Sequence, residues 1–296
     1  MRSCPVCDAD PSASVLFLEE NIDAARLSRF SFSSRKEPEF MNARLVRCLN
    51  CDLVYVEAPP SQEALTSAYR EAAYDSSGEA EDAARSYIEA FRPILAKLPR
   101  KGGALEIGTG TGALLDLLAA EGFSTLHGVE PSAAAIAAAP EARRRWIRQG
   151  AFNEAAYQPQ SLDLICCPMT LEHVRDPRSL AKSARRLLRP GGAFVTVAHD
   201  YRGMVNRILG KRSPIVDIEH MQLFSRRSMR RLLESTGYRD ITVRPLANSY
   251  SLTYWLRLMP LPAHIKATGR RIISGLRVDH LKARLNVGNI IAAGYR

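Results

Sequence analysis

The chain has 296 residues and a formal net charge of +10, with 46% hydrophobic and 24% charged residues. This length allows a full α/β core with a smaller appended module, and the composition excludes a disordered or fibrous chain. No run of about 18 apolar residues predicts a transmembrane helix, and the first residues lack the apolar stretch of a secretory signal. We therefore expect a cytoplasmic protein.

The positive charge is concentrated in the last third of the chain. Residues 201–296 contain 18 Lys and Arg against 5 Asp and Glu, whereas residues 1–200 contain 23 against 26. Such a local excess indicates an anionic partner for that region, or a solvated basic face without a partner. Composition alone leaves both interpretations open.

Two Cys-x2-Cys pairs predict a metal centre near the N-terminus. Tight turns can deliver four thiolates to one tetrahedral zinc ion, which leaves no coordination position open for catalysis. Two disulfides are the alternative, which a reducing compartment disfavours. The spacer between the pairs is long for a zinc ribbon and contains predicted strands at Ser14–Leu18, Leu45–Arg47 and, just beyond it, Leu53–Val56. We expect residues 1–58 to form a module stapled by structural zinc, with the ligands Cys4, Cys7, Cys48 and Cys51.

Residues 59–100 predict a helical cap or linker. The run Ala58-Pro59-Pro60-Ser61 breaks the chain and supplies an N-cap serine for a first helix. A second helix, at about Ala83–Lys97, carries Tyr87, Ile88 and Phe91 at helical spacing, so these side chains should face the core.

A glycine-rich turn follows the next predicted strand, Ala104–Ile107, and leads directly into a helix that begins near Gly112. A strand, a glycine turn and a helix together bring bare backbone N–H groups and a helix N-terminus close to a ligand. A plain tight turn is the alternative interpretation. The candidate ligand-binding residues of this stretch are Glu106, Gly108, Thr109, Gly110 and Gly112.

Alternating strands and helices then predict a doubly wound α/β sheet. Glu130 closes the second strand, at the sheet edge where a carboxylate can accept hydrogen bonds from a ribose diol. Met169 and Thr170 leave the carboxyl end of the fourth strand, at the same edge. The predicted strands of this domain, residues 101–296, continue with Thr125–Val129, Arg145–Arg148, Leu162–Cys167, Ala193–Ala198, Asp240–Leu246 and Asn289–Tyr295. An insertion at about residues 247–288 separates the last two, and its length predicts helices.

The G-x-G-x-G turn, its flanking acids Glu106 and Glu130, and the runs at 171–177 (LEHVRDP) and 187–192 (LLRPGG) resemble the class I S-adenosylmethionine (SAM) methyltransferases. The resemblance covers residues 100–246. It implies a Rossmann-like, seven-stranded sheet with an antiparallel last strand, and SAM as cofactor. It also implies that Pro131, Phe152, Met169 and Thr170 border the cofactor, and that Tyr69 and Tyr74 fold over it.

Methyl transfer to oxygen or carbon requires a base, and five side chains of the cofactor edge are candidates: His173, His199, Asp200, Glu219 and His220. The pair Glu219-His220 also resembles a Glu-His pair of the zinc-ribbon sugar C-methyltransferases, whose His acts as base. The chain differs from that family at Asp217, where a Tyr is expected, and no counterpart of its additional C-terminal domain follows. We expect O- or C-methylation of a sugar, glycan or lipid-linked intermediate, with His220, Glu219 and His173 as catalytic candidates.

Residues 250–284 combine an apolar and aromatic run with Lys and Arg, which suits peripheral contact with a membrane. Packing of these residues on the sheet or a dimer contact is the alternative. An rRNA or tRNA methyltransferase is the competing function, because zinc modules also precede SAM domains in such enzymes. Against it, residues 1–51 hold no basic patch interleaved with aromatics, and Cys167-Pro168-Met169-Thr170 replaces an Asn-Pro-Pro-Tyr motif. A non-catalytic binding protein is a third possibility. The sequence gives no oligomeric state.

Overall fold

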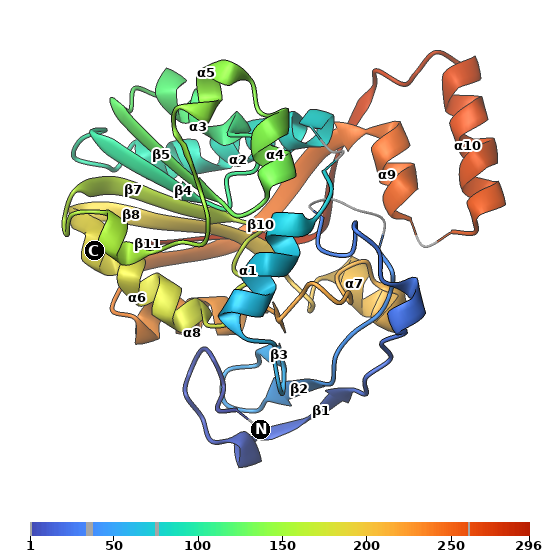
Figure 1. The fold of residues 1–296 in the computed structure, drawn as a ribbon, viewed down its shortest axis with the longest axis horizontal. Coiled ribbons are helices and arrows are strands. Elements are labelled where there is room, and N and C mark those ends of the chain that lie inside the picture. The colour runs from blue at the N-terminus through green and yellow to red at the C-terminus, as the bar shows by residue number, and fades with distance from the viewer. Residues whose placement is uncertain (1, 34–37, 75–76, 260) are drawn as a thin grey trace.

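The computed structural model describes residues 2–33, 38–74, 77–259 and 261–296. Their strands form two sheets, a large one in the methyltransferase-like region and a small one near the N-terminus (Figure 1). In this part of the chain, no helix is long and apolar enough to cross a membrane.

The large sheet has seven strands in the order β10-β11-β8-β7-β4-β5-β6. Strand β11 is antiparallel to both of its neighbours, and the other pairs are parallel. This order confirms the predicted Rossmann-like sheet with an antiparallel last strand. The strands are β4 (Gly103–Ile107), β5 (Thr125–Glu130), β6 (Ile147–Gln149), β7 (Leu162–Pro168), β8 (Leu188–His199), β10 (Arg239–Ser251) and β11 (Lys282–Tyr295).

Helices cover both faces of this sheet because its central strands are apolar on both sides. Leu105 and Ile165 belong to one core cluster with helices α6 and α8, whereas Ala104 and Leu164 belong to a second cluster with α2 and α3. Side chains alternate along each strand, so consecutive residues enter opposite cores. The helices are α2 (Ser77–Leu95), α3 (Ala113–Ala120), α4 (Ala133–Ala138), α5 (Glu141–Arg144), α6 (Pro177–Leu187) and α8 (Arg226–Ser235).

The small sheet joins the N-terminal region to the rest of the chain. Its order is β1-β2-β3-β9, and β9 (Gln222–Leu223) comes from the methyltransferase-like region. The first three strands are β1 (Ser14–Leu18), β2 (Leu45–Cys48) and β3 (Val54–Val56). Helix α1 (Gln62–Glu71) follows, with Ser61 accepting a hydrogen bond at its N-terminus as expected. The short 3-10 turns are Pro11–Ala13, Ala24–Arg26, Glu154–Ala156 and Gly210–Arg212.

The last two strands extend well beyond their predicted ends and form a long hairpin that pairs as far as Ser251 and Lys282. Much of the expected insertion is therefore strand. The sequence did not predict these strand extensions because their residues show no regular alternation of apolar and polar side chains. Its tip contains the expected helices, α9 (Leu252–Leu258) and α10 (Ala263–Gly275). A further helix, α7 (Met204–Leu209), follows β8, and Figure 1 shows α7, α9 and α10 in the right half of the view, with α10 at the outer edge.

Candidate functional site

A single cavity of about 980 Å³ runs along the carboxyl ends of β4, β5, β7 and β8. Ligands of open α/β sheets bind at this edge. The volume lies at the upper end of the range of small-molecule sites, about 300–1,000 Å³. The cavity is therefore large enough for more than one ligand.

The glycine turn after β4 forms one wall of this cavity. Gly108 and Gly112 have φ angles of +78° and +75°, which a side chain would strain. A Cβ on Gly108 would also overlap Thr170 Oγ1. Gly110, at φ +56°, has no atom of the described residues, its chain neighbours apart, within 4 Å of the position a Cβ would take, so this part of the turn faces open space. Within the turn, the Thr109 hydroxyl donates to Glu106 Oε2 at 2.5 Å.

Glu130 lies across from the turn at the end of β5, and both of its carboxylate oxygens accept backbone hydrogen bonds. The donors are the N–H groups of Gly110 and Ser132, each at 2.8 Å. The side chain is buried, and burial raises the pKa of Glu130 above its ordinary value. These two bonds fix the carboxylate while each oxygen keeps a second lone pair for a ligand hydroxyl. The open glycine turn and this carboxylate fit the ribose and amino-acid ends of SAM.

Most of the other residues predicted to contact the cofactor also line the cavity: Pro131, Phe152, Met169, Thr170 and Tyr69. The Thr170 hydroxyl donates towards the carbonyls of Ile107 and Pro168 at 3.1 and 3.0 Å, which ties the ends of β4 and β7 together. Tyr74 lies outside the lining. Its buried hydroxyl has no hydrogen-bond partner in the described part of the chain.

A group of four polar side chains occupies the far end of the same cavity. The Tyr69 hydroxyl lies 2.9 Å from His173 Nδ1 and 3.2 Å from the Glu219 carbonyl oxygen. His173 Nδ1 lies 3.8 Å from Glu219 Oε2. The rings of His173 and His220 are 4.8 Å apart between centroids and tilted by 31°. Residues from three separate segments of the chain therefore meet here, and burial holds the pKa of Tyr69 well above its ordinary value.

The ring orientation of His220 is set by a hydrogen bond from Nδ1 to the Ile215 carbonyl oxygen, at 2.9 Å. A carbonyl only accepts, so Nδ1 carries the proton and Nε2 keeps its lone pair in the neutral ring. Ligand atoms of His173, Glu219 and His220 lie within 4.8 Å of one another, which is a donor set that a divalent metal can use. The same contacts between imidazole, carboxylate and phenol groups also suit proton transfer.

The remaining candidate bases are placed differently. His199 lines the cavity, its Nδ1 lies 2.8 Å from Asn289 Oδ1, and burial lowers its pKa to about 4. Asp200 does not line the cavity; its carboxylate accepts from the Arg202 N–H and pairs with Arg226. Glu172, which sequence reasoning did not single out, is fully buried. Its Oε1 accepts from the His199 N–H at 2.9 Å, and burial raises its pKa to about 7.

Aromatic and amide side chains of the hairpin also line the cavity, and sequence reasoning did not place them there. Tyr250, Tyr254 and Trp255 pack with ring centroids 4.6 to 6.4 Å apart and line the cavity. Tyr254 and Trp255 are only 6% exposed. They pack against the domain rather than reach outward, as the packing alternative predicts. Asn248 is 3% exposed and lines the cavity, and its Oδ1 has no hydrogen-bond partner among the described residues.

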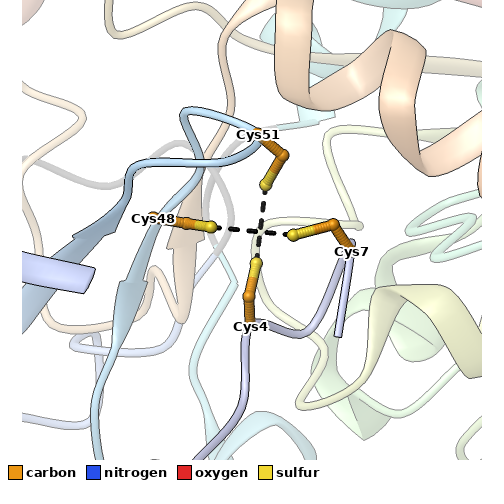
Figure 2. A group of neighbouring side chains, drawn as sticks. All are labelled: Cys4, Cys7, Cys48 and Cys51. Atoms are coloured by element: carbon orange, nitrogen blue, oxygen red, sulfur yellow. Dashed lines mark hydrogen bonds between the residues drawn. The ribbon is translucent and has the colours of Figure 1, made fainter. Parts of the chain in front are cut away.

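The four N-terminal cysteines converge as their spacing predicts, with their sulfur atoms directed at one point (Figure 2). The Sγ atoms of Cys4 and Cys51 are 3.5 Å apart, those of Cys7 and Cys48 are 3.6 Å apart, and all four lie within 4.8 Å of one another. A tetrahedral ion with Zn–S bonds of about 2.3 Å requires S–S distances near 3.8 Å. The sulfurs are too far apart for disulfides, whose bond is about 2.05 Å. The donor set therefore fits zinc.

Two similar turns present these cysteines. Each pair ends in an Asp with positive φ, Asp8 at 64° and Asp52 at 65°. The N–H of each Asp donates to the carbonyl of the first cysteine of its pair, at 2.9 Å. Asp52 also binds Arg202 at 2.5 Å and the Tyr201 hydroxyl at 2.7 Å. The second turn is thereby tied to the chain just after β8.

The small sheet connects this centre to the cavity. His220 comes two residues before β9, which pairs with β3. Between them, the Met221 carbonyl accepts from the Val56 N–H at 2.9 Å, and the Met221 N–H donates to the Glu172 carbonyl at 2.7 Å. The backbone that carries Glu219 and His220 is therefore held between the N-terminal strands and the loop after β7.

A family of methyltransferase domains matches residues 80–243, more than half of the chain. The chain belongs to this methyltransferase domain family. Among curated relatives, it is 27% identical over 165 residues to a ubiquinone biosynthesis O-methyltransferase of Aliivibrio fischeri, covering 50% of this chain and 70% of that protein. It is 30% identical over 125 residues to the enzyme of the same name from Yersinia pestis, covering 38% of this chain and 52% of that one.

Solved structures agree on the fold. A putative methyltransferase from an antibiotic biosynthesis pathway of Anabaena variabilis superposes with a TM-score of 0.50 at 15% identity, covering 71% of this chain and 97% of that one. The protein is thus a SAM-dependent methyltransferase with a Rossmann-like domain, as the glycine turn and its acids indicate. The matched region begins at residue 80, so the cysteine module lies outside it.

Proposed function

We propose that this methyltransferase transfers a methyl group to a hydroxyl oxygen, or an acidic carbon, of a small sugar, glycan or lipid-linked acceptor. The observation that carries the proposal is the meeting of His173, Glu219 and His220 with the glycine turn in one cavity. The relatives named O-methyltransferases favour oxygen as the acceptor atom. When bound, SAM supplies an electrophilic methyl group.

The cofactor is held by the residues around the glycine turn. Glu130 accepts hydrogen bonds from the ribose hydroxyls, the turn 108–112 leaves room for the amino-acid portion, and Phe152 borders the adenine. Tyr69 covers the cofactor from the side of α1. These roles rest on the lining of the cavity and on the two backbone hydrogen bonds that orient Glu130.

His220 acts as the base. Its Nδ1 proton is engaged by the Ile215 carbonyl, so Nε2 is the nitrogen that takes the proton from the acceptor hydroxyl. The Glu219 carboxylate lies close enough to favour the cation that forms. His173 and Tyr69 extend the network on the other side and keep the rings in place. Binding the acceptor in this orientation lowers the barrier chiefly by proximity.

The acceptor occupies the space between this network and the hairpin. Asn248 Oδ1 is a buried acceptor that no group in the described ranges of the chain satisfies, so a hydroxyl of the bound molecule would satisfy it. Tyr250, Tyr254 and Trp255 offer flat apolar faces against which a ring packs. A hydroxylated ring, as in a sugar, matches both features.

The cysteine centre holds structural zinc in this proposal, and the exposed residues of 250–284, chiefly those of α10, contact a membrane that contains the acceptor. Four thiolates at near-tetrahedral spacing support the first statement. The exposed basic and apolar residues of α10 support the second. Because zinc fixes the turn next to β2 and β3, it also stabilises the strand pairing that places His220.

The test incubates the protein with deuterated SAM and an extract of lipids and sugar nucleotides, followed by mass spectrometry. We expect a labelled glycan or lipid-linked product with the native protein, and at least a roughly hundredfold lower yield with His220→Gln. Gln keeps a polar side chain of similar length but cannot take the proton. Labelled RNA bases instead of a small product, or equal yields from both proteins, would contradict the proposal.

A further inference from the structure

We propose that α7 and the α9–α10 tip form one docking surface for an anionic phospholipid bilayer, placed around the acceptor end of the cavity. The inference rests on the proposed function, which assigns the cavity to the methyl acceptor. It extends the membrane contact from residues 250–284 to α7 and gives the acceptor a route into the cavity. Its test needs no turnover.

Helix α7 carries apolar side chains on two faces. Met204 and Ile208 are each 76% exposed and stand four residues apart, so they share the outer face. Val205 and Leu209, also four residues apart, line the cavity. A short helix in solution gains nothing from an apolar outer face. Helix α7 therefore separates the cavity from solvent, with apolar side chains on both sides.

The α9–α10 tip also carries exposed apolar residues. Of the fourteen large hydrophobic residues that are exposed in the described chain, nine lie within residues 204–208 and 259–285. Met259 both lines the cavity and is 47% exposed. On α10, Ile265 and Ile272 are seven residues apart and therefore lie on one stripe, and they are 44% and 56% exposed. No residue of α10 is buried.

The same two segments are strongly basic. Residues 202–214 and 257–284 together contain eleven Lys and Arg and one acid, Asp279. Some of these cations pair with acids of α2, such as Lys282 with Asp82. Others are exposed, namely Arg207 on α7, Arg212 in the turn after it, and Arg270 and Arg271 on α10.

Charge and apolar exposure together identify the occupant. Two copies of a surface this basic would repel each other, so a dimer through it is disfavoured. A nucleic acid would match the charge but would leave Met204, Ile208 and Ile272 in water. A bilayer with anionic headgroups matches both, because cations contact the headgroups while apolar side chains enter the interface. An acceptor with an apolar tail then enters the cavity between α7 and α9 without leaving the membrane.

The experiment is co-sedimentation of the full-length protein with vesicles of phosphatidylcholine, with or without phosphatidylglycerol. We expect binding only to the vesicles with phosphatidylglycerol. Met204→Ser combined with Ile208→Ser should weaken it roughly tenfold, and so should Arg270→Glu combined with Arg271→Glu. Arg230→Glu combined with Arg231→Glu is the matched control: it makes the same charge change on exposed residues of α8 and should leave binding within about twofold of the native protein.

Unaltered SAM binding and melting temperature show that each variant is folded. Absence of vesicle binding by the native protein overturns the proposal, as does an equal loss in the α8 control. So does tight binding of RNA with no binding to vesicles, or a dimer in sedimentation equilibrium that Met204→Ser and Ile208→Ser dissociate. Vesicle binding together with absent methyl transfer would instead count against the proposed function alone.

Discussion

The two ends of the cavity are built in different ways. The cofactor end is built around the turn 108–112 and Glu130, which close two successive strands and are joined by the Gly110–Glu130 hydrogen bond. The acceptor end is assembled from Tyr69, His173, His220 and Asn248, which lie on four distant segments. Local backbone geometry therefore sets the first end, whereas the second depends on tertiary packing and on the N-terminal sheet. Perturbations should separate the two.

The largest effect is expected from removing the metal of the cysteine centre. Metal analysis should find one zinc per chain, and Cys48→Ser should abolish it and lower the melting temperature strongly, because structural zinc sites contribute about 10 kcal/mol or more. Cys166→Ser, in the buried strand β7, is the control and should retain zinc. A native protein without zinc would contradict the stabilising role given to the module.

Glu172 should make the stability of the folded protein depend on pH. Its pKa of about 7 in the folded protein exceeds the ordinary value of 4.5. The folded state thus keeps a proton that the unfolded state releases, and stability falls as pH rises from about 4.5 to 7. The shift corresponds to a loss on the order of 3 kcal/mol.

Replacing Glu172 by Gln should remove this dependence. Urea unfolding at pH 4.5 and pH 8 should show that Glu172→Gln gains stability relative to the native protein at the higher pH. A difference between the two proteins that does not change with pH would show that Glu172 titrates normally.

A methyl group added to the glycine turn should weaken the binding of SAM. Gly110→Ala places a Cβ where no atom of the described residues, its chain neighbours apart, lies within 4 Å. The free energy of unfolding should therefore fall only by the strain of a positive φ angle, about 1 kcal/mol. We expect SAM affinity to fall roughly tenfold to a hundredfold by calorimetry. Gly275→Ala, also in open space but at the end of α10, should bind SAM normally. If Gly110→Ala binds SAM with unchanged affinity, the cofactor does not lie against the turn.

The smallest effect is expected at Asn248. Removing its unpartnered Oδ1 with Asn248→Ala should raise the KM for the acceptor about fivefold to tenfold, because one neutral hydrogen bond contributes roughly 1 kcal/mol. The kcat and the affinity for SAM should stay close to the native values. Weaker SAM binding would place Asn248 at the cofactor end instead.

The same contrast explains how much the sequence could reveal. The seven-stranded sheet, the cysteine cluster and the position of Glu130 follow from short-range patterns, and the structure contains all three. The sequence predicts a shorter hairpin of β10 and β11 than the structure contains, because apolar and polar residues alternate only weakly in its outer half. The inward packing of Trp255 and the role of Asn248 depend on contacts between distant segments, such as Trp255 Nε1 with the Ala283 carbonyl. Spacing carries no signal for such contacts.

The N-terminal module shows a second limit of local patterns. Cys4-x2-Cys7 and Cys48-x2-Cys51 predict the sulfur cluster but not the pairing of β3 with β9. That pairing is decided by a two-residue strand more than 160 residues further along the chain. It is nevertheless what connects the module to His220.

Calorimetry of SAM binding by the native protein, Glu130→Ala and His220→Ala tests the separation of the two ends most directly, and it needs no acceptor. The native protein and His220→Ala should bind SAM with similar affinity. Glu130→Ala should bind roughly a hundredfold more weakly, because charge-assisted hydrogen bonds to the ribose are lost. Equal weakening by both substitutions, or no effect of Glu130→Ala, would contradict the account.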